Sequence, residues 1–154
     1  MVACRFVVTF VVSLAVVAQL AGQSTTRASV GSNGQESVAP CLDGSISADG
    51  RYVAFSACDG NLVSQVWAGI LVRDRCTQEL EMVSVSTAGV PANLPCTCRY
   101  PALSADERFV AFTIFASNLV GGDTNSCTDV FVRDRVGGIT TLVSKHPSGS
   151  LGNN

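Results

Sequence analysis

Short apolar runs recur along this chain, separated by clusters of glycine, aspartate, serine and asparagine. The clearest is Tyr-Val-Ala-Phe at residues 52–55, which returns as Phe-Val-Ala-Phe at 109–112. Short runs bounded by turn residues predict β-strands rather than helices. A strand with one solvated face would alternate apolar and polar residues, so we expect both runs to be covered on both faces.

The residues before each run predict a tight hairpin. Asp49-Gly50 joins the first run to a short preceding strand, because glycine accepts the positive φ that such a turn requires. In the second copy Glu107 stands in the place of Gly50. A side chain disfavours positive φ, so this turn must avoid positive φ or carry some strain, and we expect a type I-like turn there.

The similarity between the two stretches extends well beyond the hairpin. Three motifs recur: Asn-Leu-Val at 61–63 and 118–120, Val-Arg-Asp-Arg at 72–75 and 132–135, and Val-Ser at 83–84 and 143–144. The offset is 57 residues for the first motif and 60 for the second, and the difference falls in one loop. Surface loops tolerate such insertions, so the chain contains two full copies of one repeat unit.

Each unit predicts four strands. In the first unit they lie just before Asp49 and at residues 52–56, 70–73 and 80–85. A repeat of this length with four strands is typical of a β-propeller blade. A sheet that is apolar on both faces cannot bury them alone, so we expect neighbouring blades to stack on it.

The N-terminal residues predict an export signal. The basic residue Arg5 is followed by an apolar run to Leu20 and then by the small residues Ala21 and Gly22. This is the layout of a secretory signal peptide, and the run is short of the roughly 20 residues that span a bilayer. We expect a periplasmic or extracellular protein that meets the membrane only through this segment before cleavage. An uncleaved anchor helix is the alternative.

The expected organisation has four parts: signal peptide 1–21, linker with a partial-blade strand 22–40, first blade 41–95, and second blade with tail 96–154. The partial strand is residues 26–30, which align with residues 81–85 of the first full unit. The chain therefore predicts one extra strand in front of the two complete units.

These motifs resemble the TolB-like (WD-type) β-propeller repeats of bacterial envelope and secreted proteins, over nearly all of residues 25–149. The resemblance implies an all-β fold of two four-stranded antiparallel blades plus an N-terminal strand, an incomplete propeller. It also implies a binding scaffold whose partners are other propeller blades, through self-association, or an envelope or extracellular protein. Because such repeats precede hydrolase domains in some peptidases, the alternative is a remnant of a secreted enzyme whose catalytic domain lies outside this chain.

The number of blades departs from that family. A closed propeller usually has about four to eight blades, and this sequence has two and a strand. A fragment of a longer reading frame, a ring assembled from several chains and an open wedge are three explanations, and we expect the first, then the second. In a monomer we expect Ile114, Phe115, Val130 and Phe131 to lie on or near uncovered faces, where apolar side chains favour association.

Composition argues against several classes of function. The net charge is −2 and 14 % of residues are charged, without a basic stripe, so we expect no nucleic-acid binding. Hydrophobic residues make up 47 %, which argues against disorder. The sequence has no Gly-x-Ser-x-Gly elbow, and nothing marks its one histidine as part of a catalytic triad, so we expect no catalysis and no cofactor.

Seven cysteines are present and Cys4 falls in the signal peptide, which leaves six that predict disulfides in an exported chain. In the repeat register one end of the strands carries five of them: Cys41, Cys58, Cys96, Cys98 and Cys127. Cys76 falls at the other end, so we expect it to lack an intrachain partner and Cys41 to pair with Cys98. A zinc site at Cys96-Thr97-Cys98 is the weaker interpretation, because the spacing is short and the only histidine, His146, is distant.

One loop resembles a calcium-binding loop. Asp123, Asn125 and Asp129 place side-chain oxygens at positions 1, 3 and 7. The later glutamate and the loop glycine of such sites are missing, so an Asx-type turn without a metal is the expected role. A calcium-dependent adhesion module is the alternative.

The Arg-Asp pair at 73–74 returns at 133–134. Recurrence within a repeat predicts a structural role, either an ion pair or a turn hydrogen bond that fixes each unit.

Overall fold

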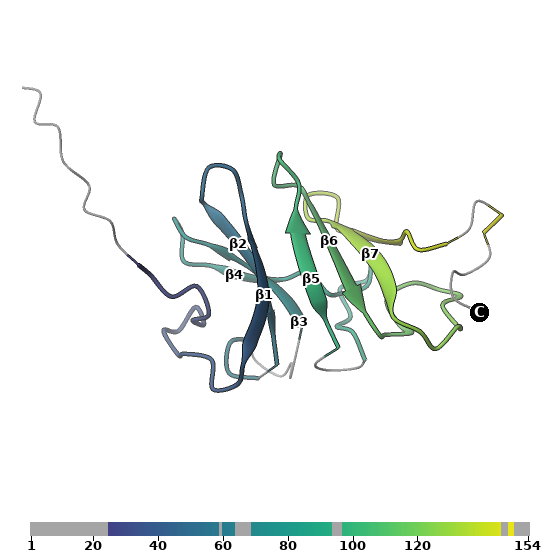
Figure 1. The fold of residues 1–154 in the computed structure, drawn as a ribbon, viewed down its shortest axis with the longest axis horizontal. Coiled ribbons are helices and arrows are strands. Elements are labelled where there is room, and N and C mark those ends of the chain that lie inside the picture. The colour runs from purple at the N-terminus through teal and green to yellow at the C-terminus, as the bar shows by residue number, and fades with distance from the viewer. Residues whose placement is uncertain (1–24, 59, 64–68, 94–96, 146–147, 150–154) are drawn as a thin grey trace, which may run out of the picture.

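The computed structural model describes residues 25–58, 60–63, 69–93, 97–145 and 148–149. Its strands are β1 (Cys41–Ile46), β2 (Tyr52–Ala57), β3 (Gly69–Asp74), β4 (Leu80–Met82), β5 (Arg99–Leu103), β6 (Phe109–Ile114), β7 (Asp129–Asp134) and β8 (Ile139–Leu142). They form two antiparallel four-stranded sheets, sheet 1 with the order β1-β2-β3-β4 and sheet 2 with the order β5-β6-β7-β8 (Figure 1). The all-β prediction with four strands in each unit is confirmed.

Among the described residues, no helix is long and apolar enough to cross a membrane. The predicted signal peptide, residues 1–21, lies outside the described residues.

The hairpin that opens sheet 1 is fixed by serine and aspartate side chains. Ser47 Oγ donates to Asp49 Oδ1 at 2.6 Å and accepts from the backbone nitrogen of Tyr52 at 2.9 Å. The hairpin of sheet 2 repeats both bonds with Ser104, Asp106 and Phe109. The recurring Ser-Ala-Asp motif is therefore a turn device that closes each hairpin in the same way.

The expected type I-like turn is formed, since neither Ala105 nor Asp106 at its centre has a positive φ, but Glu107 at its end does not avoid positive φ. Glu107 has φ +62°, close to the +74° of Gly50 at the same place in sheet 1. Its backbone nitrogen donates to Ser104 O at 2.9 Å, as that of Gly50 donates to Ser47 O. Because the same hydrogen bonds close both turns, Glu107 is held in the left-handed conformation, which costs about 1 kcal/mol or more for a residue with a side chain.

The two sheets pack on one another and share one core. We call the face that carries Ala54 in sheet 1, and its counterpart Ala111 in sheet 2, the front of each sheet, and the opposite face the back. The front of sheet 1 meets the back of sheet 2, where Phe112 and Phe131 stack with ring centres 6.0 Å apart. Figure 1 shows β1 and β5 side by side at this junction. Stacking of the two repeat units buries the apolar surface that each leaves open.

The segment before sheet 1 reaches the back of that sheet, where Arg73 Nη1 donates to Val30 O at 2.8 Å. A second core of Phe55, Ala57, Leu62 and Leu71 lies there. Val30 bridges to Glu36, as Val85 bridges to Pro91 before sheet 2, so both units are entered through similar turns. The extra strand predicted at residues 26–30 is not formed, because no other strands of such a unit lie beside it.

Coverage of both strand faces is confirmed only for part of β2 and is wrong for β6. The last four residues of β2 and every residue of β3 are buried, whereas Tyr52 and Val53 are half-buried and β6 alternates between buried and half-buried residues. Ile114 and Phe131, expected near uncovered faces, are fully buried because they lie on the back of sheet 2 under sheet 1. Val130 lies on the front of sheet 2 and is exposed as expected, while Phe115 is half-buried.

Candidate functional site

The recurring aspartates hold the turn between the third and fourth strand of each sheet. Asp74 pairs with Arg51, and Asp134 with Arg108, each with an Nη2–Oδ2 distance of 2.6 Å. Asp134 Oδ1 also accepts from the backbone nitrogen of Gly137 at 2.9 Å. The guanidinium beside each carboxylate holds the pKa of both aspartates well below the usual range. The predicted structural role of the recurring aspartate is confirmed.

The recurring arginine joins each sheet to the turn that precedes it. Arg73 Nη1 donates to Val30 O at 2.8 Å, and Arg133 Nη1 donates to Ser86 O at 3.2 Å and Gly138 O at 3.0 Å. Both acceptors outside the sheets belong to the bridged turns that cover the sheet backs. This arginine therefore links consecutive repeat units.

The Asn-Leu-Val motif has the same kind of role. Asn118 Nδ2 donates to Pro91 O at 2.8 Å, and its Oδ1 accepts from the backbone nitrogen of Asn93 at 3.0 Å. Leu119 is buried in the shared core. The repeat in the sequence signals that the motif is structural, but its partner became evident only from the fold.

A cation–π contact crosses the junction between the sheets. The guanidinium of Arg135 lies 4.5 Å from the centre of the Tyr52 ring, and its Nε donates to Glu81 at 2.9 Å. Arg51 lies 4.8 Å from the same ring. Such contacts are worth about 0.5–2 kcal/mol. Tyr52 therefore carries two guanidinium groups, one from its own sheet and one from the next.

The counterparts of this contact are only half-formed. Arg108 lies 5.0 Å from the centre of the Phe109 ring, which is the counterpart of Tyr52, and no second guanidinium lies over that ring among the described side chains. Arg75 is the counterpart of Arg135, yet it is exposed, and in the part of the chain that the structure describes its side chain donates only to Gly50 O, at 2.6 Å. Arg75 and Phe109 are thus the counterparts of Arg135 and Tyr52, but they do not contact each other within one chain.

The front of sheet 2 is an exposed apolar face. Val143 is 47 % exposed, whereas its counterpart Val83 in sheet 1 is fully buried against sheet 2. Val130 and Ile139 on the same face are 37 % and 50 % exposed. We call Val130, Ile139 and Val143 the front end face. Contiguous exposed apolar side chains of this kind mark binding surfaces.

The back of sheet 1 is open at one edge. Ile46 is 59 % exposed and Val53 is half-buried, whereas Val110, the counterpart of Val53, is fully buried under sheet 1. Both side chains line a cavity of about 520 Å³ together with Arg75. We call Ile46, Val53 and Arg75 the back end face.

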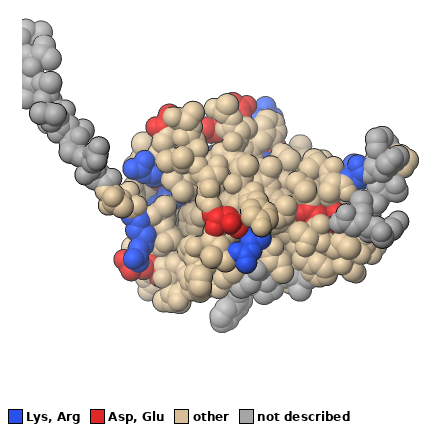
Figure 2. All heavy atoms as spheres, in the orientation of Figure 1, with Lys and Arg blue, Asp and Glu red and all other residues tan. Residues whose placement is uncertain are grey.

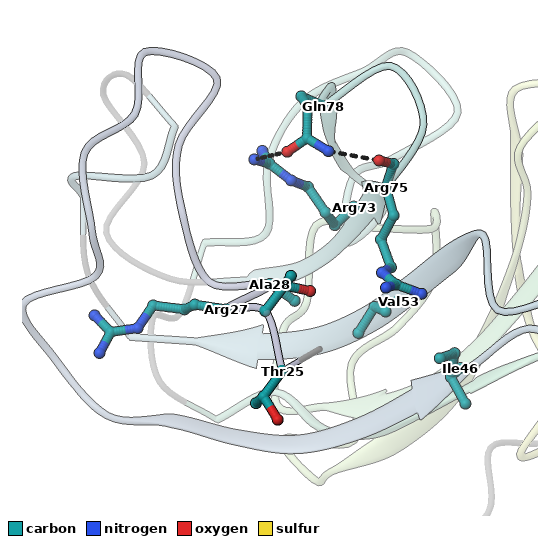
Figure 3. A pocket seen from close by; sticks show the side chains of 9 residues that line it. Thr25, Arg27, Ala28, Ile46, Val53, Arg73, Arg75 and Gln78 are labelled. Carbon is teal, nitrogen blue, oxygen red and sulfur yellow. Dashed lines mark hydrogen bonds between the residues drawn. The ribbon is translucent and has the colours of Figure 1, made fainter. Parts of the chain in front are cut away.

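Figure 3 shows this cavity from close by. Gln78 lies between Arg73 and Arg75, where it accepts from the Arg73 side chain at 2.9 Å and donates to Arg75 O. Residues 25–28 form the opposite wall. The polar groups of Arg73 and Gln78 are satisfied within the chain, which leaves the Arg75 guanidinium and the apolar side chains for a partner.

The predicted calcium-loop residues are brought together. Asn125 Nδ2 donates to Asp129 Oδ2 at 2.9 Å, and Asn125 Oδ1 accepts from the backbone nitrogen of Cys127 at 3.1 Å. The Asx-type turn is therefore confirmed. Asp129 also accepts from Ser144 Oγ at 2.6 Å, and it is fully buried. Within the described part of the chain, no three His, Cys, Asp or Glu side chains are grouped to hold a metal ion.

Asp123 differs from its neighbours. Its side chain is buried, and none of the described residues donates a hydrogen bond to its carboxylate. Burial, and then the nearby charge of Asp129, raise the pKa of the Asp123 carboxyl. Asp123 is thus the predicted site carboxylate that accepts no hydrogen bond from the described residues, and it lines two surface hollows.

The expected Cys41–Cys98 disulfide is not present, and the described cysteines form no disulfide with one another. Cys41 lies on sheet 1 and its thiol donates to Ser37 Oγ at 3.3 Å, whereas Cys98 is buried in the core between the sheets. Cys76 lies exposed at the opposite end of the strands, as its register predicts. Cys96 and His146, the residues of the weaker zinc interpretation, lie outside the described residues.

A strained tyrosine on β5 escaped the sequence analysis. Tyr100 has φ +54° at the bulge of β5, where its counterpart Asp43 has φ +46° at the bulge of β1. The Tyr100 side chain is 70 % exposed and its backbone nitrogen donates to Asp43 at 3.4 Å. Bulky residues with positive φ are rare and often mark binding sites. Pro101, which follows it, restricts its backbone but does not by itself indicate positive φ, so only its alignment with Asp43 could have found it.

No model of a known protein family matches this chain, and no curated protein matches its sequence significantly.

Proposed function

We propose that this chain is an exported, non-catalytic binding or scaffold module of TolB-like propeller repeats, which binds by stacking its end faces on sheets of the same kind. One observation carries the proposal: Val83 is buried at the junction of the two sheets, while Val143, in the same place on sheet 2, is 47 % exposed. The molecule contains one complete junction between sheets, and the front end face and the back end face could together form a second one.

The use of the recurring charged residues supports a scaffold. The recurring aspartates cap turns, the arginines before them join consecutive units, and Arg135 joins the two sheets. On the side of the molecule shown in Figure 2, charged residues form small separate groups on a largely uncharged surface. Such a surface suits a protein partner better than a nucleic acid.

Sedimentation velocity over a range of concentrations tests the proposal. The wild-type chain is expected to associate as its concentration rises, and Val143→Asp to weaken this association by placing a charge on the front end face. Val136→Asp is the matched control, because Val136 is 80 % exposed in the turn between β7 and β8 and belongs to neither end face. A wild-type chain that stays monomeric at every concentration would contradict the proposal.

A calcium-dependent adhesion module is the second candidate. It is favoured by one observation: Asp123 is buried beside Asp129 without a hydrogen-bond donor among the described residues. A cation at this place would remove the cost of burying that charge.

A further inference from the structure

We infer that the partner of the end faces is a second copy of this chain, bound head to tail, so that the front of sheet 2 of one copy covers the back of sheet 1 of the next. This inference rests on the proposed function and specifies its partner. Both halves of the contact lie on one molecule, and the interface they form is heterologous.

The junction within the chain provides the geometry. The back of sheet 2 is covered by two elements, the bridged turn at residues 85–91 and the front of sheet 1. On the back of sheet 1, the first of these is already supplied by residues 30–36, to which Arg73 is bonded through Val30 O. Only a sheet front is missing, and the front of sheet 2 is the counterpart of the one that fills this place within the chain.

Arg75 and Phe109, whose counterparts form the cation–π contact within the chain, would meet across the same contact. In the chain, Arg135 on sheet 2 reaches Tyr52 on the front of sheet 1. By the same relation, Arg75 of one copy would reach Phe109 of the next, whose ring already carries Arg108 as Tyr52 carries Arg51. Thr141 stands where Glu81 pairs with Arg135, so a hydroxyl replaces a carboxylate and the contact between copies is weaker than the one within the chain.

The apolar parts match as well. Val130 and Val143 of the second copy take the places that Ile70 and Val83 occupy at the internal junction. They would cover the back of sheet 1, as Ile70 and Val83 pack with the back of sheet 2 in the shared core. The bridged turn at residues 30–36 stays in place, so the second copy supplies only its sheet front to this contact.

A mixing experiment distinguishes this arrangement from others. Val143→Asp blocks the front end face and Ile46→Asp blocks the back end face, and each position is about half exposed, so folding is preserved. Each variant alone is expected to stay monomeric in sedimentation velocity at concentrations where the wild type associates. An equimolar mixture is expected to form a dimer of one copy of each, because one free front and one free back remain.

Three outcomes would overturn the head-to-tail contact while leaving the proposed function in place. Association of Ile46→Asp alone would mean that two fronts meet, and association of Val143→Asp alone would mean that two backs meet. The third outcome is a mixture that stays monomeric. A monomeric wild type would remove the proposed function itself. Circular dichroism melts check folding. Should either variant melt early, Thr141→Lys and Arg75→Glu replace them, since both residues are exposed.

Discussion

Arg135 on sheet 2 lies 4.5 Å from the centre of the Tyr52 ring on sheet 1, while its Nε donates to Glu81 on the same sheet. Its side chain is 15 % exposed. The contact joins the two sheets, so it helps to fix how one repeat unit sits on the next.

We expect Arg135→Ala to lower the free energy of unfolding by about 1–2 kcal/mol, since it removes a partly buried cation–π contact and an ion pair. Arg75→Ala, the same substitution at the counterpart position, is expected to change it by less than about 0.5 kcal/mol, because Arg75 is exposed. Urea titration of dilute, monomeric protein measures both. Equal losses in the two variants would mean that the contact with Tyr52 contributes nothing.

Replacement of Glu107 is expected to stabilise the fold. Its φ of +62° strains a residue with a side chain, and burial, followed by the nearby Asp49, raises the pKa of its carboxyl. Glu107→Gly is therefore expected to raise the free energy of unfolding by about 1 kcal/mol or more. Glu107→Gln removes the charge and keeps the strain, so it separates the two causes.

The pH dependence of these two variants is the measurement. A raised pKa in the folded state means that the charge penalty of Glu107 grows as the pH rises from the usual carboxyl range. Glu107→Gln should gain over the wild type near neutral pH and lose that gain in acid, whereas the strain relieved in Glu107→Gly persists at both. A glycine variant that is no more stable than the wild type would show that the turn carries no strain.

The strands and their order could be predicted because the repeat reports each element twice. Tyr52 and Phe109 begin equivalent strands, and an error in one unit would have been visible in the other. The positive φ of Glu107 was not predicted, because propensity describes one residue, whereas the hydrogen bonds of Ser104 and Asp106 fix the turn as a whole. The faces of sheet 2 were predicted wrongly in part, because composition shows that Ile114 is apolar but not which sheet covers it.

The site could be predicted less well than the fold. The recurrence of the aspartates indicated a structural role. The end faces, however, are defined by whether a neighbouring sheet covers them, and no residue type in the sequence indicates this. Val83 and Val143 are the same residue in the same motif, and only their surroundings differ.

Asp134 makes stability depend on pH in acid. Arg108, and then the backbone nitrogens of the turn, hold its pKa well below the usual value of 3.8, so its charge stabilises the fold above that value. This contribution is expected to be lost as the pH falls below about 3.8 towards the lowered pKa. Asp134→Asn keeps an oxygen for Val136 and Gly137 but loses the ion pair. Its urea midpoint should lie below that of the wild type at pH 7 and approach it in acid, and a constant gap would contradict the assignment.

The cysteines should differ in reactivity. Cys76 is exposed at the end of the strands opposite Cys41, whereas Cys41 is half-buried and its thiol donates to Ser37 Oγ at 3.3 Å. We expect a maleimide to label Cys76 faster than Cys41 in the native protein, and both equally fast after unfolding, because solvent access controls thiol reactivity. Peptide mapping by mass spectrometry identifies the labelled residue. A native protein in which Cys76 is disulfide-bonded within the chain would overturn the register of the repeat.

Asp123 links stability to both pH and calcium. Because burial and Asp129 raise its pKa in the folded state, its charge destabilises the fold increasingly as the pH rises above the usual value of 3.8. Asp123→Asn should therefore melt at a higher temperature than the wild type at pH 7 and at a similar temperature at pH 3.

Calcium bound here would cancel the same cost, so calcium chloride should raise the melting temperature of the wild type and leave Asp123→Asn unchanged. Magnesium chloride at equal ionic strength is the control. A wild type that ignores calcium would remove the adhesion candidate, while a variant that melts no higher than the wild type at pH 7 would show that the buried charge is compensated.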